Sequence, residues 1–190
     1  AFYDCSSLSS LVIPNRVMSI KGNLFCGWYG ELKCLSPYFI YENNVLFDKD
    51  KSTIISFRDQ DTTSYVIPAG VTSIGDCAFE GCESLISLVI PDSVTSIGDR
   101  AFVYCKSLRS LVIPDSVTRI GDRAFDHCES LHSLVIPDSV TSIGAWAFRS
   151  CRSLTDIVIP DSITSIVTGA FSDCESLKSF VIPNSVTSIE

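Results

Sequence analysis

Residues 87–102 read SLVIPDSVTSIGDRAF, and close copies of this stretch recur along the chain. The tetrapeptide LVIP or a near variant ends at Pro14, Pro68, Pro91, Pro114, Pro137, Pro160 and Pro183. From Pro68 onward every step is 23 residues, and the full unit is SLxSLVIPDSVTSIGDRAFxxCx. A fixed period of this length indicates that each unit forms one coil and that successive coils stack on one another.

The apolar positions of one unit predict how its coil is built. Leu88 and Ile90 alternate with Ser87 and Val89, which predicts a strand whose leucine and isoleucine face inward. Pro91 to Ser93 predict a turn, because proline fixes φ and the aspartate side chain can accept from nearby backbone N–H groups. Residues 94–97 then predict a second short strand.

The second half of the unit predicts a corner and a compact turn. We expect Gly98 to allow a corner that other residues resist. We expect Asp99 to be the N-cap of a single helical or 3₁₀ turn that carries Ala101 and Phe102. The phenylalanine recurs at Phe2, Phe25, Phe79, Phe102, Phe125, Phe148 and Phe171, mostly beside an alanine, which predicts a buried column.

The pattern LxxLxIPxxVxxIGxxAFxxCxxL resembles the BspA-like, or Treponema-type, leucine-rich repeats over residues 1–32 and 65–190. The asparagine typical of other leucine-rich repeats is replaced here by the IPDS turn. The resemblance implies a leucine-rich-repeat solenoid: right-handed, β-rich parallel coils with short 3₁₀ or helical turns, about seven to eight coils of 23 residues. It also implies a protein at the cell surface or secreted, which adheres to host proteins or to other cells.

Residues 33–64 break the period, and we interpret them as a degenerate coil with an insertion inside a single solenoid spanning 1–190. Residues 45–57, VLFDKDKSTIISF, predict a β-hairpin that turns at Asp48 to Lys51. The hairpin is either a structural kink or edge cover, which we favour, or a protruding contact. Since both ends of the chain fall inside a repeat unit, we expect it to be a fragment of a longer protein.

Charge and hydropathy exclude several classes of partner. The formal net charge is −8 at pH 7, whereas nucleic acid and anionic lipid both attract clusters of lysine and arginine. No apolar run approaches the roughly 18 residues of a membrane-spanning helix. We therefore predict no nucleic-acid partner and no direct membrane insertion of this segment.

The cysteines and aspartates follow the repeat, which points to structure instead of chemistry. Six cysteines share one repeat position and are predicted to be buried reduced thiols: Cys5, Cys82, Cys105, Cys128, Cys151 and Cys174. Cys26, Cys34 and Cys77 lie outside this column, and a disulfide among them stays open. The aspartates form two columns, Asp92, Asp115, Asp138, Asp161 and Asp76, Asp99, Asp122. Calcium could relieve repulsion between stacked aspartates, but turn and cap roles explain both columns.

We predict no metal, no cofactor and no catalytic residue. There is no CxxC pair, and His127 and His132 lack a zinc signature. No GxSxG motif, phosphate-binding loop or dinucleotide fingerprint is present.

In a solenoid, the residues that vary while the frame repeats carry the specificity. On the predicted strand face the variable column is Ile86, Arg109, His132, Thr155 and Lys178, and beside it runs an outward valine column of Val89, Val112, Val135, Val158 and Val181. An exposed apolar stripe marks a contact surface, although β-propensity alone also explains valine. The second candidate, the turn face, combines Arg100, Arg123 and Trp146 in one column with Tyr104 and His127 in another. Exposed tryptophan, tyrosine and arginine are enriched at binding hot spots, although ordinary surface variation also explains these residues.

The leading hypothesis is a non-catalytic surface or secreted adhesion module that recognises a protein or glycan on host or neighbouring cells. One alternative is a structural spacer that holds another domain away from the cell. The other is an intracellular protein-interaction scaffold.

Overall fold

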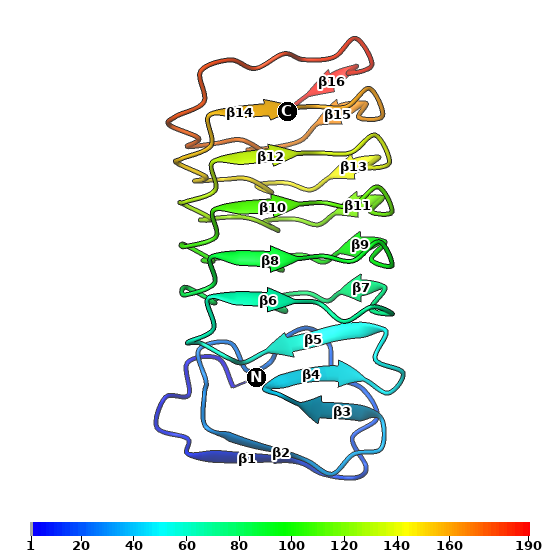
Figure 1. Cartoon of the computed structure of the whole chain (residues 1–190), viewed down its shortest axis with the longest axis vertical. Coiled ribbons are helices and arrows are strands. Elements are labelled where there is room, and N and C mark those ends of the chain that lie inside the picture. The colour runs from blue at the N-terminus through cyan, green and yellow to red at the C-terminus, as the bar shows by residue number, and fades with distance from the viewer. Residues whose placement is uncertain (1) are drawn as a thin grey trace.

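The computed structural model describes residues 2–190 as a stack of coils with strands on two of its sides (Figure 1). A five-stranded parallel sheet contains β6 (Ser64–Val66), β8 (Ser87–Val89), β10 (Ser110–Val112), β12 (Ser133–Val135) and β14 (Asp156–Val158). A seven-stranded sheet contains β3 (Phe39–Glu42), β4 (Val45–Asp48), β5 (Thr53–Phe57), β7 (Ser73–Ile74), β9 (Ser96–Ile97), β11 (Arg119–Ile120) and β13 (Ser142–Ile143). Two further parallel pairs join β1 (Ser10–Ile13) to β2 (Glu31–Cys34) and β15 (Ser165–Ile166) to β16 (Ser188–Ile189). This is the stacked, β-rich solenoid that the repeat predicts.

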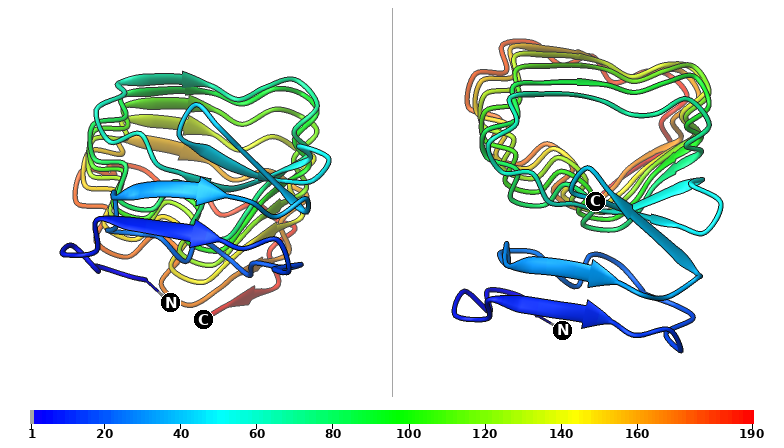
Figure 2. Two further views of the ribbon diagram at one scale, coloured as in Figure 1. Left: turned by 90° about the horizontal axis from the view of Figure 1, so that it is seen from below. Right: turned by 60° about the horizontal axis from the view of Figure 1, so that its bottom comes forward.

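The strands pair in a register of one repeat, so equivalent residues lie side by side. Leu111 of β10 pairs with Leu88 of β8 and with Leu134 of β12. Figure 2 shows the outlines of the regular coils lying nearly over one another. The inward positions of all coils therefore form one continuous core.

The phenylalanine column fills the centre of that core, as predicted. The rings of Phe79, Phe102, Phe125, Phe148 and Phe171 are stacked, with successive centroids 5.1, 5.2, 5.4 and 5.5 Å apart. Phe102, Phe125 and Phe148 are fully buried. Phe2 and Phe25 form a separate stacked pair with their centroids 6.3 Å apart, and Phe25 belongs to a second core cluster.

The predicted helical turn after Asp99 is wrong, because no part of residues 2–190 is assigned to a helix and residues 99–104 form turns. Arg100 and Tyr104 have φ values of 56° and 60°, and this left-handed backbone interrupts any helical geometry. The N–H groups of Arg100, Phe102 and Tyr104 donate instead to carbonyls of the next coil. Asp99 caps that coil as well, since its Oδ1 accepts from the Asp122 N–H at 3.0 Å.

Other residues are resisted at Gly98, as predicted, and the cause is a close approach between coils. The φ of Gly98 is not among the positive values, so the corner needs no left-handed glycine there. A Cβ at Gly98 would lie 2.7 Å from both the Asp76 N and the Gly75 carbonyl carbon. Glycine is required because adjacent coils approach too closely for a side chain.

The predicted hairpin is confirmed, and it carries a third strand that the sequence did not reveal. β4 and β5 pair antiparallel, with Val45 opposite Phe57, and β3 pairs antiparallel with β4 on the other side. β5 then pairs parallel with β7, which joins the hairpin to the regular coils.

The three-stranded insertion lies between two hydrophobic cores. Residues 45, 47, 54 and 57 pack into the main core, whereas residues 39, 46 and 55 pack into the smaller core of the first coils. The Phe57 ring lies 5.0 Å from that of Phe79 and so extends the phenylalanine column. The Arg58 Nη2 donates to the carbonyls of Trp28 and Gly30 at 3.2 and 2.9 Å. These contacts favour the structural interpretation of the insertion over a protruding contact.

Candidate binding surfaces

Four residues of the valine column lie on the outer surface of the five-stranded sheet, and Val181 occupies the same repeat position in the next coil. Val89, Val112, Val135, Val158 and Val181 are between 55% and 79% exposed. Strand pairing sets Val112 beside Val135 and Val135 beside Val158. Val66 of β6 is 62% exposed and pairs with Val89, so it extends the stripe by one coil. Val66 was not predicted as part of the stripe, although the YVIP of residues 65–68 carries the signal.

The variable column runs along the entry to the same strands. Backbone hydrogen bonds link Ile86, Arg109, His132, Thr155 and Lys178 in succession, each N–H donating to the carbonyl one coil earlier. All are exposed except Thr155, which is half-buried. Arg109 and Lys178 form no ion pair with any residue in 2–190. Their charged ends are therefore free to meet a ligand.

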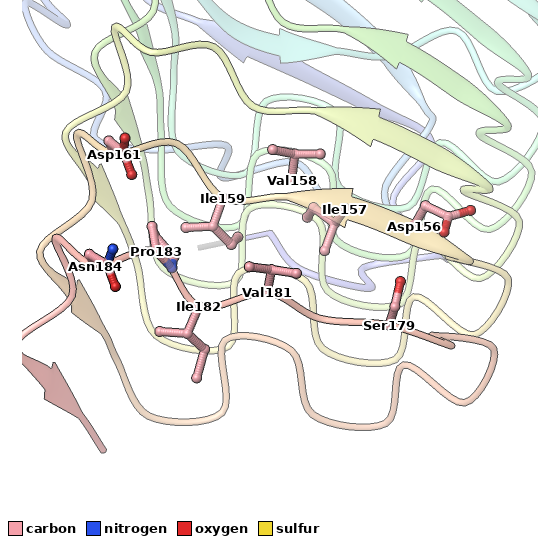
Figure 3. A pocket seen from close by; sticks show the side chains of 10 residues that line it. All are labelled: Asp156, Ile157, Val158, Ile159, Asp161, Ser179, Val181, Ile182, Pro183 and Asn184. Carbon is pink, nitrogen blue, oxygen red and sulfur yellow. The ribbon is translucent and has the colours of Figure 1, made fainter.

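The stripe ends at a hollow beside β14. Residues 179–182 continue the strand position of the repeat but are not assigned to a strand. Between them and β14 lies a cavity of about 520 Å³. Figure 3 shows Val158 and Val181 at this cavity together with Asp156, Ser179 and Ile182. The strand face thus combines a flat apolar stripe with one concave end that carries a carboxylate.

The turn face is set by its backbone. Arg100, Arg123, Trp146, Tyr104 and His127 all have φ between 55° and 60°. Glycine occupies the equivalent positions in other coils, at Gly169 and Gly81. The residue types in these two columns are therefore limited by the left-handed backbone as well as by exposure to solvent.

Contacts within the chain engage most of the turn face. The rings of Tyr104 and His127 lie 4.8 Å apart. The buried Asp126 carboxylate contacts His127 Nδ1 at 2.8 Å and accepts from Arg149 Nε at 2.9 Å. The guanidinium of Arg149 lies 5.6 Å from the Trp146 ring centroid. This network was not predicted, because Asp126 occupies a position that has other residue types in the neighbouring coils.

The cysteine column is part of the core. Cys105, Cys128 and Cys151 are fully buried, and each Sγ donates to the carbonyl of a phenylalanine, at 3.1 to 3.3 Å. A thiol that donates this hydrogen bond is reduced. Burial raises the pKa of Cys82 and Cys77 to about 12 and that of Cys174 to about 11. Cys26, Cys34 and Cys77 also carry free thiols.

The buried thiols make stability depend on alkaline pH. The folded pKa of Cys128 is raised well above the ordinary value by burial, whereas the unfolded chain has a thiol pKa near 8.5. As pH rises above about 8.5, only the unfolded state releases this proton, so each such thiol lowers the free energy of unfolding by about 1.4 kcal/mol per pH unit. We expect Cys128→Ala to flatten the decline between pH 8.5 and 10 by about that amount, measured by urea unfolding under reducing conditions. Equal slopes for the two proteins would contradict a buried neutral thiol.

The column of Asp76, Asp99 and Asp122 has a structural role. Asp76, Asp99 and Asp122 each accept from a backbone N–H of the following coil, at 2.9 to 3.0 Å. Asp99 also accepts from Arg119 at 3.2 Å. Within residues 2–190, no group of three or more histidine, cysteine, aspartate or glutamate side chains is arranged to hold a metal ion. In the same range no helix is long and apolar enough to cross a membrane.

Known proteins resemble the chain over most of its length. A family model described as the BspA type leucine-rich repeat region matches residues 1–36, 54–166 and 95–190. A leucine-rich cell surface protein from Faecalibacterium prausnitzii A2-165 is 33% identical, with 96% of this chain and 48% of that chain covered and a TM-score of 0.81. The pneumococcal vaccine antigen PcpA is 25% identical, with coverage of 96% and 51% and a TM-score of 0.80.

A third solved structure, the leucine-rich repeat protein of T. pallidum, is 26% identical over 80% of this chain and 78% of its own, with a TM-score of 0.63. The chain spans about half the length of the first two proteins, 48% and 51%. No curated protein matches the sequence. The repeat pattern, the stacked coils and the family match agree, and the chain belongs to the BspA-type leucine-rich repeat family, whose repeats are scaffolds for protein interaction.

Proposed function

We propose that this chain is a non-catalytic binding module of a surface or secreted protein, which adheres to a protein or glycan on host or neighbouring cells through its strand face. The observation that carries the proposal is the valine column, which exposes five stacked apolar side chains next to the variable column. A contiguous apolar patch with a polar border is typical of a contact surface.

The valine column, the variable column and the serines between them have complementary roles in recognition. The valines supply apolar area that loses water on contact, and the serines between the two columns supply hydroxyl groups. Ile86, Arg109, His132, Thr155 and Lys178 differ in charge and size, so they supply specificity. The turn face is the weaker candidate, because its aromatic and charged groups already contact one another.

The similar proteins support the location part of the proposal. One is described as a cell surface protein and another as a vaccine antigen. A surface location suits an adhesion module, and the same rigid stack would also serve a spacer.

A triple substitution on the stripe tests the proposal. We expect Val112→Lys with Val135→Lys and Val158→Lys to weaken adhesion at least about 100-fold, since three contacts of about 1 kcal/mol are lost and three charges are desolvated. Binding is measured by biolayer interferometry against immobilised extracellular-matrix proteins and cell-surface glycans. The valines are exposed, so thermal stability is expected to stay nearly unchanged.

The matched control places the same three charges on the adjacent side of the coils. Thr95, Thr118 and Thr141 are exposed next to the seven-stranded sheet, and their change to lysine is expected to leave adhesion within about threefold of the original. Equal binding by the valine variant and the original chain would refute the strand face as the adhesive surface. An equal loss in both triple variants would show that net charge alone governs binding.

A further inference from the structure

A second concave surface lies where the first coils meet the regular stack. It is a cavity of about 520 Å³, and its polar lining includes Tyr3, Asp4, Tyr29, Asp61, Glu80 and Tyr104. Glu83 lies at the same cavity, and no lysine, arginine or histidine lines it. We call this cavity the acidic recess. It has four carboxylates and three tyrosine rings around one space.

Part of the recess is open because one coil has glycine, Gly81, where later coils have an aromatic side chain. Gly81 shares its repeat position with Tyr104 and His127, whose rings pack together at 4.8 Å. Gly27 holds the same position in the preceding coil, and the Asp4 carboxylate lies directly over it. Around Gly81 an added Cβ would meet only the Tyr29 hydroxyl, 3.6 Å away. Gly81 therefore leaves open space that an aromatic ring fills in the later coils, whereas the space over Gly27 is occupied by Asp4.

Glu80 lines the recess with a charge that no cation balances. Its side chain belongs to a residue that is only 8% exposed, and it forms no ion pair within residues 2–190. Burial first, and then the nearby Glu80 carboxylate, raise the pKa values of the Cys26 and Cys77 thiols. An ammonium group that enters the recess would therefore find at Glu80 a carboxylate that is not already paired with a cation.

One ammonium group of this chain is already bound at the rim of the recess. Lys106 Nζ lies 2.7 Å from Glu83 Oε1 and 5.9 Å from the Tyr104 ring centroid. Carboxylate and tyrosine face thus hold one ammonium at the edge by charge and by a cation–π contact. Asp4, Asp61 and Glu80 form no ion pair in the part of the chain that the structure describes.

We propose that the acidic recess binds the side-chain ammonium group of a lysine presented by a protein ligand. The ammonium meets Glu80 at the floor, while the rings of Tyr3, Tyr29 and Tyr104 enclose the methylene chain. This site is separate from the strand face and operates whether or not that face is adhesive.

The test uses the peptide acetyl-Gly-Lys-Gly-amide, with its side-chain-acetylated form as the neutral comparison. Titration is followed by the amide resonances of residues 80–84 in ¹⁵N-labelled protein. We expect saturable binding of the lysine peptide and at least tenfold weaker binding of the acetylated one. Glu80→Gln is expected to weaken the lysine peptide at least fivefold.

Glu129→Gln is the matched control, because it removes one negative charge from a later coil and is expected to change affinity less than twofold. Gly81→Tyr copies Tyr104 onto a backbone that already has the required φ, 78° against 60°, and is expected to fold and to abolish binding by filling the recess. The same spectra report folding. Equal binding of both peptides, no shift at residues 80–84, or equal weakening by Glu80→Gln and Glu129→Gln would each overturn the proposal. The triple lysine variant of the strand face should bind the peptide as the original does.

Discussion

Phe125→Ala is expected to lower the free energy of unfolding by about 4 kcal/mol, which is the usual cost of deleting a fully buried phenylalanine ring. Phe125 is 0% exposed, and its ring lies 5.2 Å from that of Phe102 and 5.4 Å from that of Phe148. Removal leaves a cavity in mid-stack that the rigid coils above and below cannot close. Urea unfolding followed by circular dichroism measures the loss.

Val112→Ala is the control for this substitution. Val112 lies 13 positions before Phe125 but is 79% exposed, so we expect the free energy of unfolding to change by less than about 0.5 kcal/mol. If Phe125→Ala were as mild as Val112→Ala, the phenylalanine column would not be the core. Each coil is stabilised mainly by its neighbours, so the coils on the two sides of Phe125 could unfold in separate steps in Phe125→Ala. A second unfolding transition would therefore also be the expected destabilisation.

Gly121→Ala is expected to destabilise by about 3 kcal/mol although it adds only one methyl group, because overpacking against backbone has no flexible side chain to yield. The new Cβ would lie 2.5 Å from Asp99 Oδ1 and 2.6 Å from both the Asp99 N and the Gly98 carbonyl carbon. To relieve the contact, coils must separate and lose the hydrogen bond from the Asp122 N–H to Asp99. Thermal and urea unfolding measure the effect.

Gly70→Ala separates this contact from the general cost of replacing glycine. Gly70 has φ of 105°, and an added Cβ there meets no atom within 4 Å. We expect a loss of about 1 kcal/mol, from the left-handed backbone alone. A Gly121→Ala protein as stable as Gly70→Ala would show that the coils are not in close contact at the glycine column.

The 23-residue period made the interior predictable, because stacking in register places each apolar position of one coil next to the equivalent position of the neighbouring coils. The prediction for Phe102, Phe125 and Phe148 therefore needed no knowledge of the turns between them. The exposure of Val112 and Val135 followed by the same logic, since they alternate with inward leucines. The in-register pairing of the strands carries these positions from one coil to the next.

The turn after Gly98 was not predictable by local rules. An N-cap prediction for Asp99 assumes that its partners are N–H groups of the same turn, but the observed donor belongs to Asp122. The left-handed residues at Arg100 and Tyr104 aim their N–H groups at the next coil as well. Each of these bonds joins residues roughly one period apart, so only the stacked structure reveals them.

The irregular segment and the acidic recess were hidden for a related reason. Phe57 extends the phenylalanine column from outside the repeat, so the period does not mark it. The recess brings Asp4, Asp61 and Glu80 together from three distant segments, and glycine at position 81 gives only a weak sign of the open space.

Thiol labelling under native conditions tests most directly whether the recurring apolar positions form one continuous core and whether only the outward-facing positions are exposed to solvent. The measurement compares the rate of alkylation at Cys105, Cys128 and Cys151 with that of a cysteine introduced by Val112→Cys, using mass spectrometry of peptides. The stacked core predicts that position 112 reacts at the rate of an unfolded chain, while the three buried cysteines react at least about 1,000-fold more slowly, limited by unfolding. Rapid reaction of Cys128 in the folded protein, or protection of position 112, would contradict it.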